Sequence, residues 1–189
     1  VVPGINAIFV DIGTGKDGFL YLHDTEGIEG DTRDEDDLFL DHEYQESKKR
    51  TENARSTVQV GDKIVVQIVK EAVRHKGPRL TTKISIPARY LVLTTGGRSL
   101  GISRRISDRA ERERIRTIIT DMKRPNDVGF IVRTVAEGKS KKEFVRDMKY
   151  LLTLWQNIQR NIKPKKAPVL VHRELDLVER IIRDAFTED

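Results

Sequence analysis

The chain has 189 residues, enough for one large domain or two modest ones, and 37% of them are apolar, so each of two domains could bury a core. It has no cysteine, which excludes zinc–thiolate sites and thiol nucleophiles. No apolar run is long enough to span a bilayer, and no basic segment followed by an apolar one stands at the start. We therefore expect a cytoplasmic protein with no membrane segment in this portion. The four histidines lie too far apart in the sequence for a local metal motif.

The net charge of +5 conceals a sharp division along the chain. The segment 24–46 carries eleven acidic side chains and a single basic one, Arg33, whereas the rest of the chain carries 34 basic and 19 acidic side chains. A body so strongly cationic attracts polyanions through counterion release, and nucleic acid is the usual one. Charge alone leaves open the alternative of a solvated basic surface without such a ligand.

The first region has the pattern of short β-strands. Residues 5–22 predict two strands around a Gly-Lys-Asp-Gly hairpin, and residues 63–71 and 80–86 continue the pattern. Together they predict a small antiparallel β domain. Between them, residues 25–57 are polar, acidic and poor in periodic apolar positions, which predicts a long loop inserted between two strands.

After Pro87 the pattern changes to mixed helix and strand. Apolar residues at helical spacing predict amphipathic helices, and β-rich runs between them predict short strands. Trp155 lies on an apolar helical stripe, so we expect it in the core and not as a platform for base stacking. In chain order, we expect a strand at 90–93, a helix at 108–122, a strand at 128–135, a helix at 141–162, a strand at 169–172 and a helix at 175–186.

The segment 128–143 carries the most informative chemistry in the chain. A strand ends in Arg133 and Thr134, a glycine loop follows, and Ser140 with Glu143 forms the pattern of a capping box. A guanidinium, a hydroxyl and the N–H groups of a helix N-terminus are the ingredients of a phosphate site.

Two alternatives stand beside this phosphate site. Arg133 could be an ordinary arginine at a strand end that pairs with a local carboxylate such as Glu137. The sequence Gly-Lys-Ser at 138–140 could belong to a nucleotide-hydrolysing P-loop, but that motif needs glycine at position 133. The sequence Gly-Thr-Gly-Lys at 13–16 is followed by Asp17 in place of Ser or Thr, so neither glycine segment satisfies the P-loop pattern.

The β domain offers a second set of candidate residues, Phe9, Phe19 and Lys76. An oligonucleotide-binding (OB) barrel holds single-stranded RNA with such residues, because bases stack on aromatic rings and lysines contact phosphates. The alternative is that the two phenylalanines simply alternate into the core. Residue type alone favours that alternative.

Several short motifs occur in one order along the chain: NAIFVDIG, GFLYL, VQVGDKIVVQIVKE, KGPRLTTKISIPARYLVL, GISRRI and IVRTVAEGKS. In this order and spacing they resemble the amino-terminal half of the RNase E/G endoribonucleases. The resemblance extends from the first residues to the last, which makes it far more specific than any single motif. It implies part of a metal-dependent, single-strand-specific endoribonuclease that acts in RNA decay and in the processing of ribosomal and transfer RNA.

The resemblance implies an α+β fold in three parts. Residues 1–86 would be an OB-type RNA-binding domain, an antiparallel β-barrel that lacks its first strand and carries the acidic loop. Residues 87–178 would be a mixed α/β 5′-sensor domain, and residues 179–189 would begin an RNase H-like region.

The resemblance also assigns roles to individual residues. It gives RNA binding to Phe9, Phe19 and Lys76 and so reverses the preference for the core interpretation. It gives recognition of an RNA 5′-monophosphate to the arginine–threonine pair Arg133 and Thr134. Val92 and Ala88 match two further positions of that pocket, and the position of Ala88 is usually glycine in the family. Arg104 and Arg105 of the GISRRI motif could contact the RNA backbone or form salt bridges within the sensor.

Cleavage in this family depends on Mg²⁺ held by aspartates in a nuclease domain that follows the sensor, and paired cysteines form a Zn²⁺ link between subunits. Neither set has a match here, so we expect an internal portion that selects and holds RNA with a 5′-monophosphate but is inactive alone. Any homo-oligomer would form largely through other parts. The acidic residues 34–37 and Asp11 are better explained as solvated side chains than as metal ligands. The alternative is a non-catalytic single-stranded RNA-binding protein built from the same modules.

Overall fold

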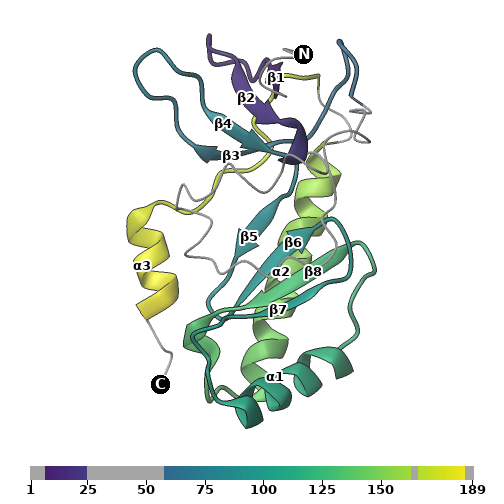
Figure 1. Ribbon diagram of the computed structural model, residues 1–189, viewed down its shortest axis with the longest axis vertical. Coiled ribbons are helices and arrows are strands. Elements are labelled where there is room, and N and C mark those ends of the chain that lie inside the picture. The colour runs from purple at the N-terminus through teal and green to yellow at the C-terminus, as the bar shows by residue number, and fades with distance from the viewer. Residues whose placement is uncertain (1–6, 25–57, 163–165, 186–189) are drawn as a thin grey trace. The chain divides into compact units, whose positions relative to one another are not determined.

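The computed structural model describes residues 7–24, 58–162 and 166–185. The chain divides into two compact units, Val1–Ile84 and Ser85–Asp189, each with its own four-stranded sheet (Figure 1). The predicted acidic loop at 25–57 lies outside the described residues, and so does the end of the predicted last helix at residue 186.

The first unit contains the strands β1 (Ala7–Val10), β2 (Gly18–Tyr21), β3 (Gln67–Lys70) and β4 (Arg79–Thr81) in the order β1-β2-β4-β3. A short 3₁₀ turn, η1 (Leu22–Asp24), follows β2. The prediction of an antiparallel domain is wrong for one pair: β2 and β4 are parallel, which the long connection between them permits. The described strands form an open sheet and not a closed barrel.

The core of the first unit is small. Ile8 and Leu20 lie directly opposite each other in the β1–β2 register, and Leu80 of β4 packs with them. Gly18 lies against Leu80 so closely that a Cβ at this position would overlap the leucine side chain. The residues next to these core positions, by strand alternation, point to the opposite face of the sheet.

The second unit contains β5 (Ser85–Pro87), β6 (Leu91–Thr95), β7 (Leu100–Ile102) and β8 (Val128–Val132) in the order β5-β6-β8-β7. The β6 pairings are antiparallel, and β7 is parallel to β8. The predicted continuous strand at 80–86 is wrong, because it divides into β4 and β5, which belong to different sheets. Strand β7 has no counterpart among the predicted elements.

Three helices accompany this sheet: α1 (Arg109–Asp121), α2 (Lys141–Ile162) and α3 (Leu177–Ala185). Asp108 caps α1 by accepting a hydrogen bond from the N–H of Ala110. The predicted bounds of α2 are confirmed. The predicted strand at 169–172 is wrong, since those residues pair with no described strand.

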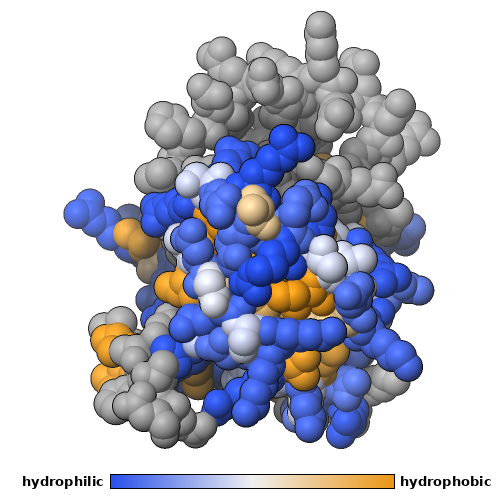
Figure 2. All heavy atoms as spheres, turned by 90° about the horizontal axis from the view of Figure 1, so that it is seen from below, coloured by the Kyte–Doolittle hydropathy of each residue, from blue (hydrophilic) through white to orange (hydrophobic). Residues whose placement is uncertain are grey.

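The core of the second unit lies between its sheet and the helices α1 and α2, and α2 runs along the sheet (Figure 1). Large side chains of β6, β8, α1 and α2 are completely buried there: Leu91, Leu93, Phe130, Val132, Ile115, Ile119, Phe144 and Leu151. Trp155 is half-buried beside them. The end of the unit that carries α1 presents a mostly hydrophilic surface with a few apolar side chains between charged ones (Figure 2).

Candidate functional site

The two predicted RNA-binding phenylalanines lie side by side on one face of the first sheet. Phe9 of β1 is directly opposite Phe19 of β2, and their ring centroids are 5.7 Å apart in an edge-to-face arrangement. Tyr21 extends this aromatic row, 4.5 Å from Phe19, and the Arg79 guanidinium lies 5.2 Å from the Tyr21 ring. Phe9 is 51% exposed, so the alternative that both phenylalanines point into the core is wrong for Phe9.

The third predicted residue of this set, Lys76, is exposed in a tight turn that precedes β4. The turn is closed by two backbone hydrogen bonds between Val73 and Lys76, and Arg74 adopts a positive φ of 51° within it. Lys16 of the β1–β2 hairpin donates a hydrogen bond from Nζ to the Arg74 carbonyl, at 2.6 Å. The lysine of the Gly-Thr-Gly-Lys sequence therefore braces the turn that carries Lys76.

Arg133 follows β8 and is held by the turn between β5 and β6. Its N–H donates to the Tyr90 carbonyl at 2.9 Å, and its Nη1 donates to the carbonyls of Ala88 and Arg89 at 2.8 and 3.2 Å. The side chains of Ala88 and Val92 are only 2% and 4% exposed, so both point into the core. Ala88 therefore meets the guanidinium through its carbonyl, and its methyl group is directed away.

A buried carboxylate stabilises the same turn. Asp147 of α2, 9% exposed, accepts hydrogen bonds from the N–H groups of Tyr90 and Leu91 at 2.6 and 3.0 Å. Burial raises the pKa of Asp147, and the two N–H donors together with the charges of Arg133 and Arg183 act in the opposite direction. Sequence reasoning missed Asp147, although an acid within the apolar stripe of a helix is a recognisable signal.

Thr134 meets a residue of the GISRRI motif. Its hydroxyl lies 2.9 Å from the hydroxyl of Ser103, and Ser103 Oγ also accepts a hydrogen bond from the Arg105 N–H at 3.3 Å. Arg112 of α1 fixes this segment by donating to the carbonyls of Ser103 and Ile106 at 2.7 and 3.0 Å. Sequence reasoning singled out the two exposed arginines of the motif and missed the serine that precedes them.

In the glycine loop after Thr134, backbone N–H groups donate hydrogen bonds to carboxylates. The Gly138 N–H donates to Glu111 of α1 at 2.8 Å, and the Ser140 N–H donates to Glu143 at 2.7 Å, which forms one half of the predicted capping box. The Arg114 side chain and the Gly138 N–H lower the pKa of Glu111 to about 2. Because these N–H groups serve protein acceptors, this loop is not arranged as a P-loop.

The described residues offer no cluster of three or more histidine, aspartate or glutamate side chains that could hold a metal ion. Within the same ranges, no helix has both the length and the apolar character needed to cross a membrane.

Comparison with known proteins supplies the decisive observation. The model of the ribonuclease E/G family matches residues 85–189, which begin where the second unit begins. This chain belongs to the ribonuclease E/G family. The chain is 36% identical to ribonuclease E of Nostoc sp. over 191 residues, which cover all of the chain and 25% of that protein. It is 35% identical to ribonuclease G of Escherichia coli K12, with 97% of the chain and 36% of that protein covered. The chain thus spans about a quarter to a third of the length of these ribonuclease E/G relatives.

Proposed function

We propose that this chain is the part of a ribonuclease E/G endoribonuclease that holds single-stranded RNA and recognises its 5′-monophosphate. In this proposal the first unit is the OB-type RNA-binding domain, the second unit carries the 5′-sensor, and Mg²⁺-dependent cleavage belongs to residues of the longer protein. The observation that carries the proposal is the guanidinium of Arg133, which two carbonyls of one turn hold in place and which Thr134 follows directly in the chain.

The chemistry of the ligand matches this arrangement. A terminal monophosphate presents three oxygens and nearly two negative charges. The Arg133 guanidinium has five N–H donors, and the bonds from Nη1 to Ala88 and Arg89 set the orientation of its plane. A planar guanidinium can bind phosphate in a bidentate manner through two parallel N–H groups. A 5′-hydroxyl offers neither the charge nor the oxygens for this contact.

The hydroxyl pair gives Thr134 a defined role in the same site. Ser103 Oγ accepts from the Arg105 N–H and lies 2.9 Å from the Thr134 hydroxyl, and either hydroxyl of this pair can be the donor. In this proposal Ser103 is the donor. Thr134 then accepts from Ser103 and retains its own proton for an oxygen of the ligand, since a hydroxyl donates once and accepts twice. Ser103 is a positioning residue in this proposal, because it acts through Thr134.

The test is equilibrium binding of two RNA oligonucleotides of one sequence, one with a 5′-monophosphate and one with a 5′-hydroxyl. We expect the chain to prefer the monophosphate and Arg133→Lys to lose about tenfold of that preference, because lysine keeps the charge without the planar fork. Arg116→Lys is the matched control, since Arg116 is an exposed arginine of α1 whose ion pair with Glu113 is long, at 3.9 Å. An unchanged preference in Arg133→Lys would contradict the sensor.

The alternative of a non-catalytic RNA-binding protein differs in what the longer protein does. We expect this chain alone to bind RNA with strong salt dependence and to leave it intact in Mg²⁺. RNA cleavage that persists through purification would instead place an active site within these 189 residues.

A further inference from the structure

Helix α2 divides its charges unequally between its two sides. Its two acidic residues, Glu143 and Asp147, face the β5–β6 turn, where they accept hydrogen bonds from Tyr90 and Leu91. The side of α2 away from the buried Phe144, Met148 and Leu151 stays in solvent, as expected for an amphipathic helix that packs on a sheet. Glu143 and Asp147 lie along one edge of this exposed side, three residues before Arg146 and Tyr150. The positions that repeat there at helical spacing are all exposed, and none is acidic: Lys142, Arg146, Tyr150, Thr153, Asn157 and Arg160.

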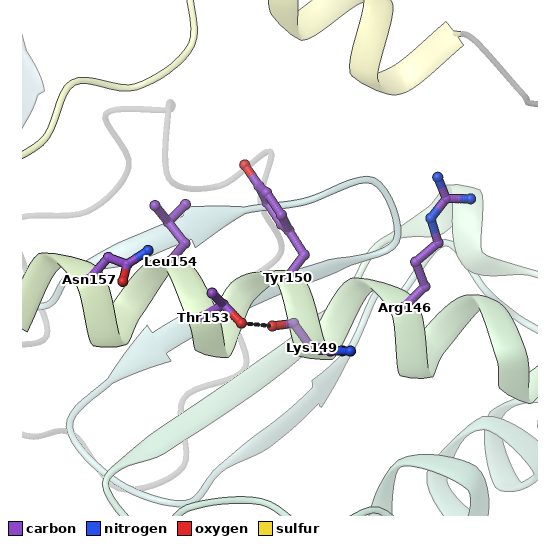
Figure 3. Close-up of a pocket in the computed structure, with 6 residues that line it drawn as sticks. All are labelled: Arg146, Lys149, Tyr150, Thr153, Leu154 and Asn157. Carbon is purple, nitrogen blue, oxygen red and sulfur yellow. Dashed lines mark hydrogen bonds between the residues drawn. The ribbon is translucent and has the colours of Figure 1, made fainter.

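We call the strip formed by these six exposed positions the outer face of α2. A shallow hollow of about 370 Å³ lies on it (Figure 3). Tyr150 stands in the hollow, 48% exposed, with its hydroxyl directed away from the helix, between Arg146 one turn before and Leu154 one turn after. Lys149 and Asn157 complete the polar lining, whereas the Thr153 hydroxyl is already used in a hydrogen bond to the Lys149 carbonyl, at 2.8 Å.

The cationic character continues beside this hollow. A neighbouring groove between the end of α1 and α2 is lined by three lysines, one acidic residue and four apolar side chains, in that order Lys123, Lys141, Lys149, Asp121, Met122, Val145, Met148 and Leu152. Along α2 the strip from Lys142 to Arg160 is about 27 Å long at 1.5 Å per residue. Its positive charge is therefore spread over a length and is not concentrated at one point.

An exposed ring between cations fits one class of ligand better than others. Proteins that bind single-stranded nucleic acid combine a positively charged track for the backbone with aromatic rings on which bases stack. The aromatic and aliphatic side chains that line the hollow itself are Tyr150 and Leu154, which suit one planar base.

We propose that the outer face of α2 is a further contact surface for single-stranded RNA. Tyr150 stacks on one base, Arg146 and Lys149 contact the adjacent phosphates, and Asn157 hydrogen bonds to a base or sugar edge. The proposal rests on the proposed function, because it extends the RNA that the chain holds beyond the aromatic row and the 5′-sensor. It predicts a contribution to affinity that does not depend on the chemical state of the 5′ end.

The test uses the 189-residue chain and a 5′-hydroxyl oligouridine, so that recognition of a terminal phosphate does not contribute. We expect Tyr150→Ala to weaken binding about tenfold, and Tyr150→Phe to retain the affinity because the ring remains. Arg146→Gln combined with Lys149→Gln should lower the slope of log affinity against log salt by about 1.4, since each lost phosphate contact removes about 0.7. Arg109→Gln with Arg116→Gln removes the same charge from exposed positions of α1 and is the matched control.

The outcomes separate this inference from the function on which it rests. A chain that binds no RNA would overturn both. A chain that binds RNA and prefers the 5′-monophosphate, but whose Tyr150→Ala variant keeps full affinity or whose double glutamine variant has the salt slope of the α1 control, would overturn the outer-face proposal alone. That second result would leave the cationic strip to a different occupant, such as an acidic protein segment.

Discussion

The aromatic row of the first unit and the arginine–threonine pair of the second unit are positioned in different ways. Phe9 and Phe19 face each other because two neighbouring strands pair in register, within a hairpin of about a dozen residues. Arg133 depends on carbonyls 44 and 45 positions earlier in the chain, and Thr134 depends on a serine 31 positions earlier. The first arrangement is local and the second exists only when the whole unit has folded.

The largest effect should come from filling a close backbone contact in the first unit. A Cβ on Gly77 would overlap the carbonyl oxygen of Asp17, so Gly77→Ala should cost about 2 kcal/mol of unfolding free energy. Gly15→Ala is the control, because Gly15 has a positive φ of 77° but open space around its Cα, and it should cost about 1 kcal/mol. Urea unfolding measures both, and equal losses would argue against the close contact as the cause.

The next prediction separates the two regions by their ligands. Phe9→Ala should weaken binding of 5′-hydroxyl and 5′-monophosphate RNA by the same factor, about tenfold, because the stacking of a base on the ring does not depend on the group at the 5′ end of the RNA. Val60→Ala, which truncates a residue that is 96% exposed in the same unit, should leave both affinities unchanged. If Phe9→Ala altered the preference between the two RNAs, the aromatic row and the sensor would not be separate contacts.

A smaller effect concerns pH and the loop that follows Thr134. The pKa of Glu111 is lowered from 4.5 to about 2, chiefly by Arg114, so its contribution to stability is complete above pH 4.5 and is lost as the pH falls towards 2. Glu111→Gln should cost about 1 kcal/mol at neutral pH after allowance for solvent screening. It should also flatten the decline in stability between pH 4.5 and 2, measured by denaturant unfolding across that range. A decline as steep as in the unsubstituted chain would place the responsible carboxylate elsewhere.

The smallest effect should appear at the positioning serine. Ser103→Ala leaves Thr134 without its hydroxyl partner, so the preference for 5′-monophosphate over 5′-hydroxyl RNA should fall about threefold. Affinity for the 5′-hydroxyl RNA should not change, and Ser103→Thr should restore part of the preference because it keeps the hydroxyl. Ser107→Ala, at an exposed serine four positions later, is the control. A merely structural role of Ser103 would reduce both affinities together.

Periodicity predicted the elements that are long or strongly patterned. The bounds of α2 are confirmed because seven apolar residues repeat at helical spacing over 22 positions, and α1 agrees within a residue at each end. Short extended segments were predicted less well. Residues 169–172 have the composition of a strand, but a strand needs a neighbour with which to exchange hydrogen bonds, and no sequence pattern supplies one.

The candidate site shows the same division. Residue type singled out Arg133 and Thr134 as candidate phosphate ligands, and strand alternation could place Phe9 beside Phe19. Two residues of the candidate site were missed: Ser103, which hydrogen bonds to Thr134, and Asp147, which accepts from the turn that holds Arg133. Each of them matters through hydrogen bonds to a distant segment, and hydrogen bonds of that kind leave no periodic pattern in the sequence.

By itself, the sequence determined that this chain belongs with the ribonuclease E/G proteins, that it combines short strands with amphipathic helices, and which side chains have the chemistry to bind RNA. The tertiary structure decided that β4 and β5 join different sheets and that N–H groups of the glycine loop donate to carboxylates. The physical reason is the range of the interactions. Side-chain type and periodicity are properties of residues that are close in the sequence. The hydrogen-bond partner of a backbone N–H or a guanidinium is often distant in the sequence, and only folding brings the two groups to about 3 Å from each other.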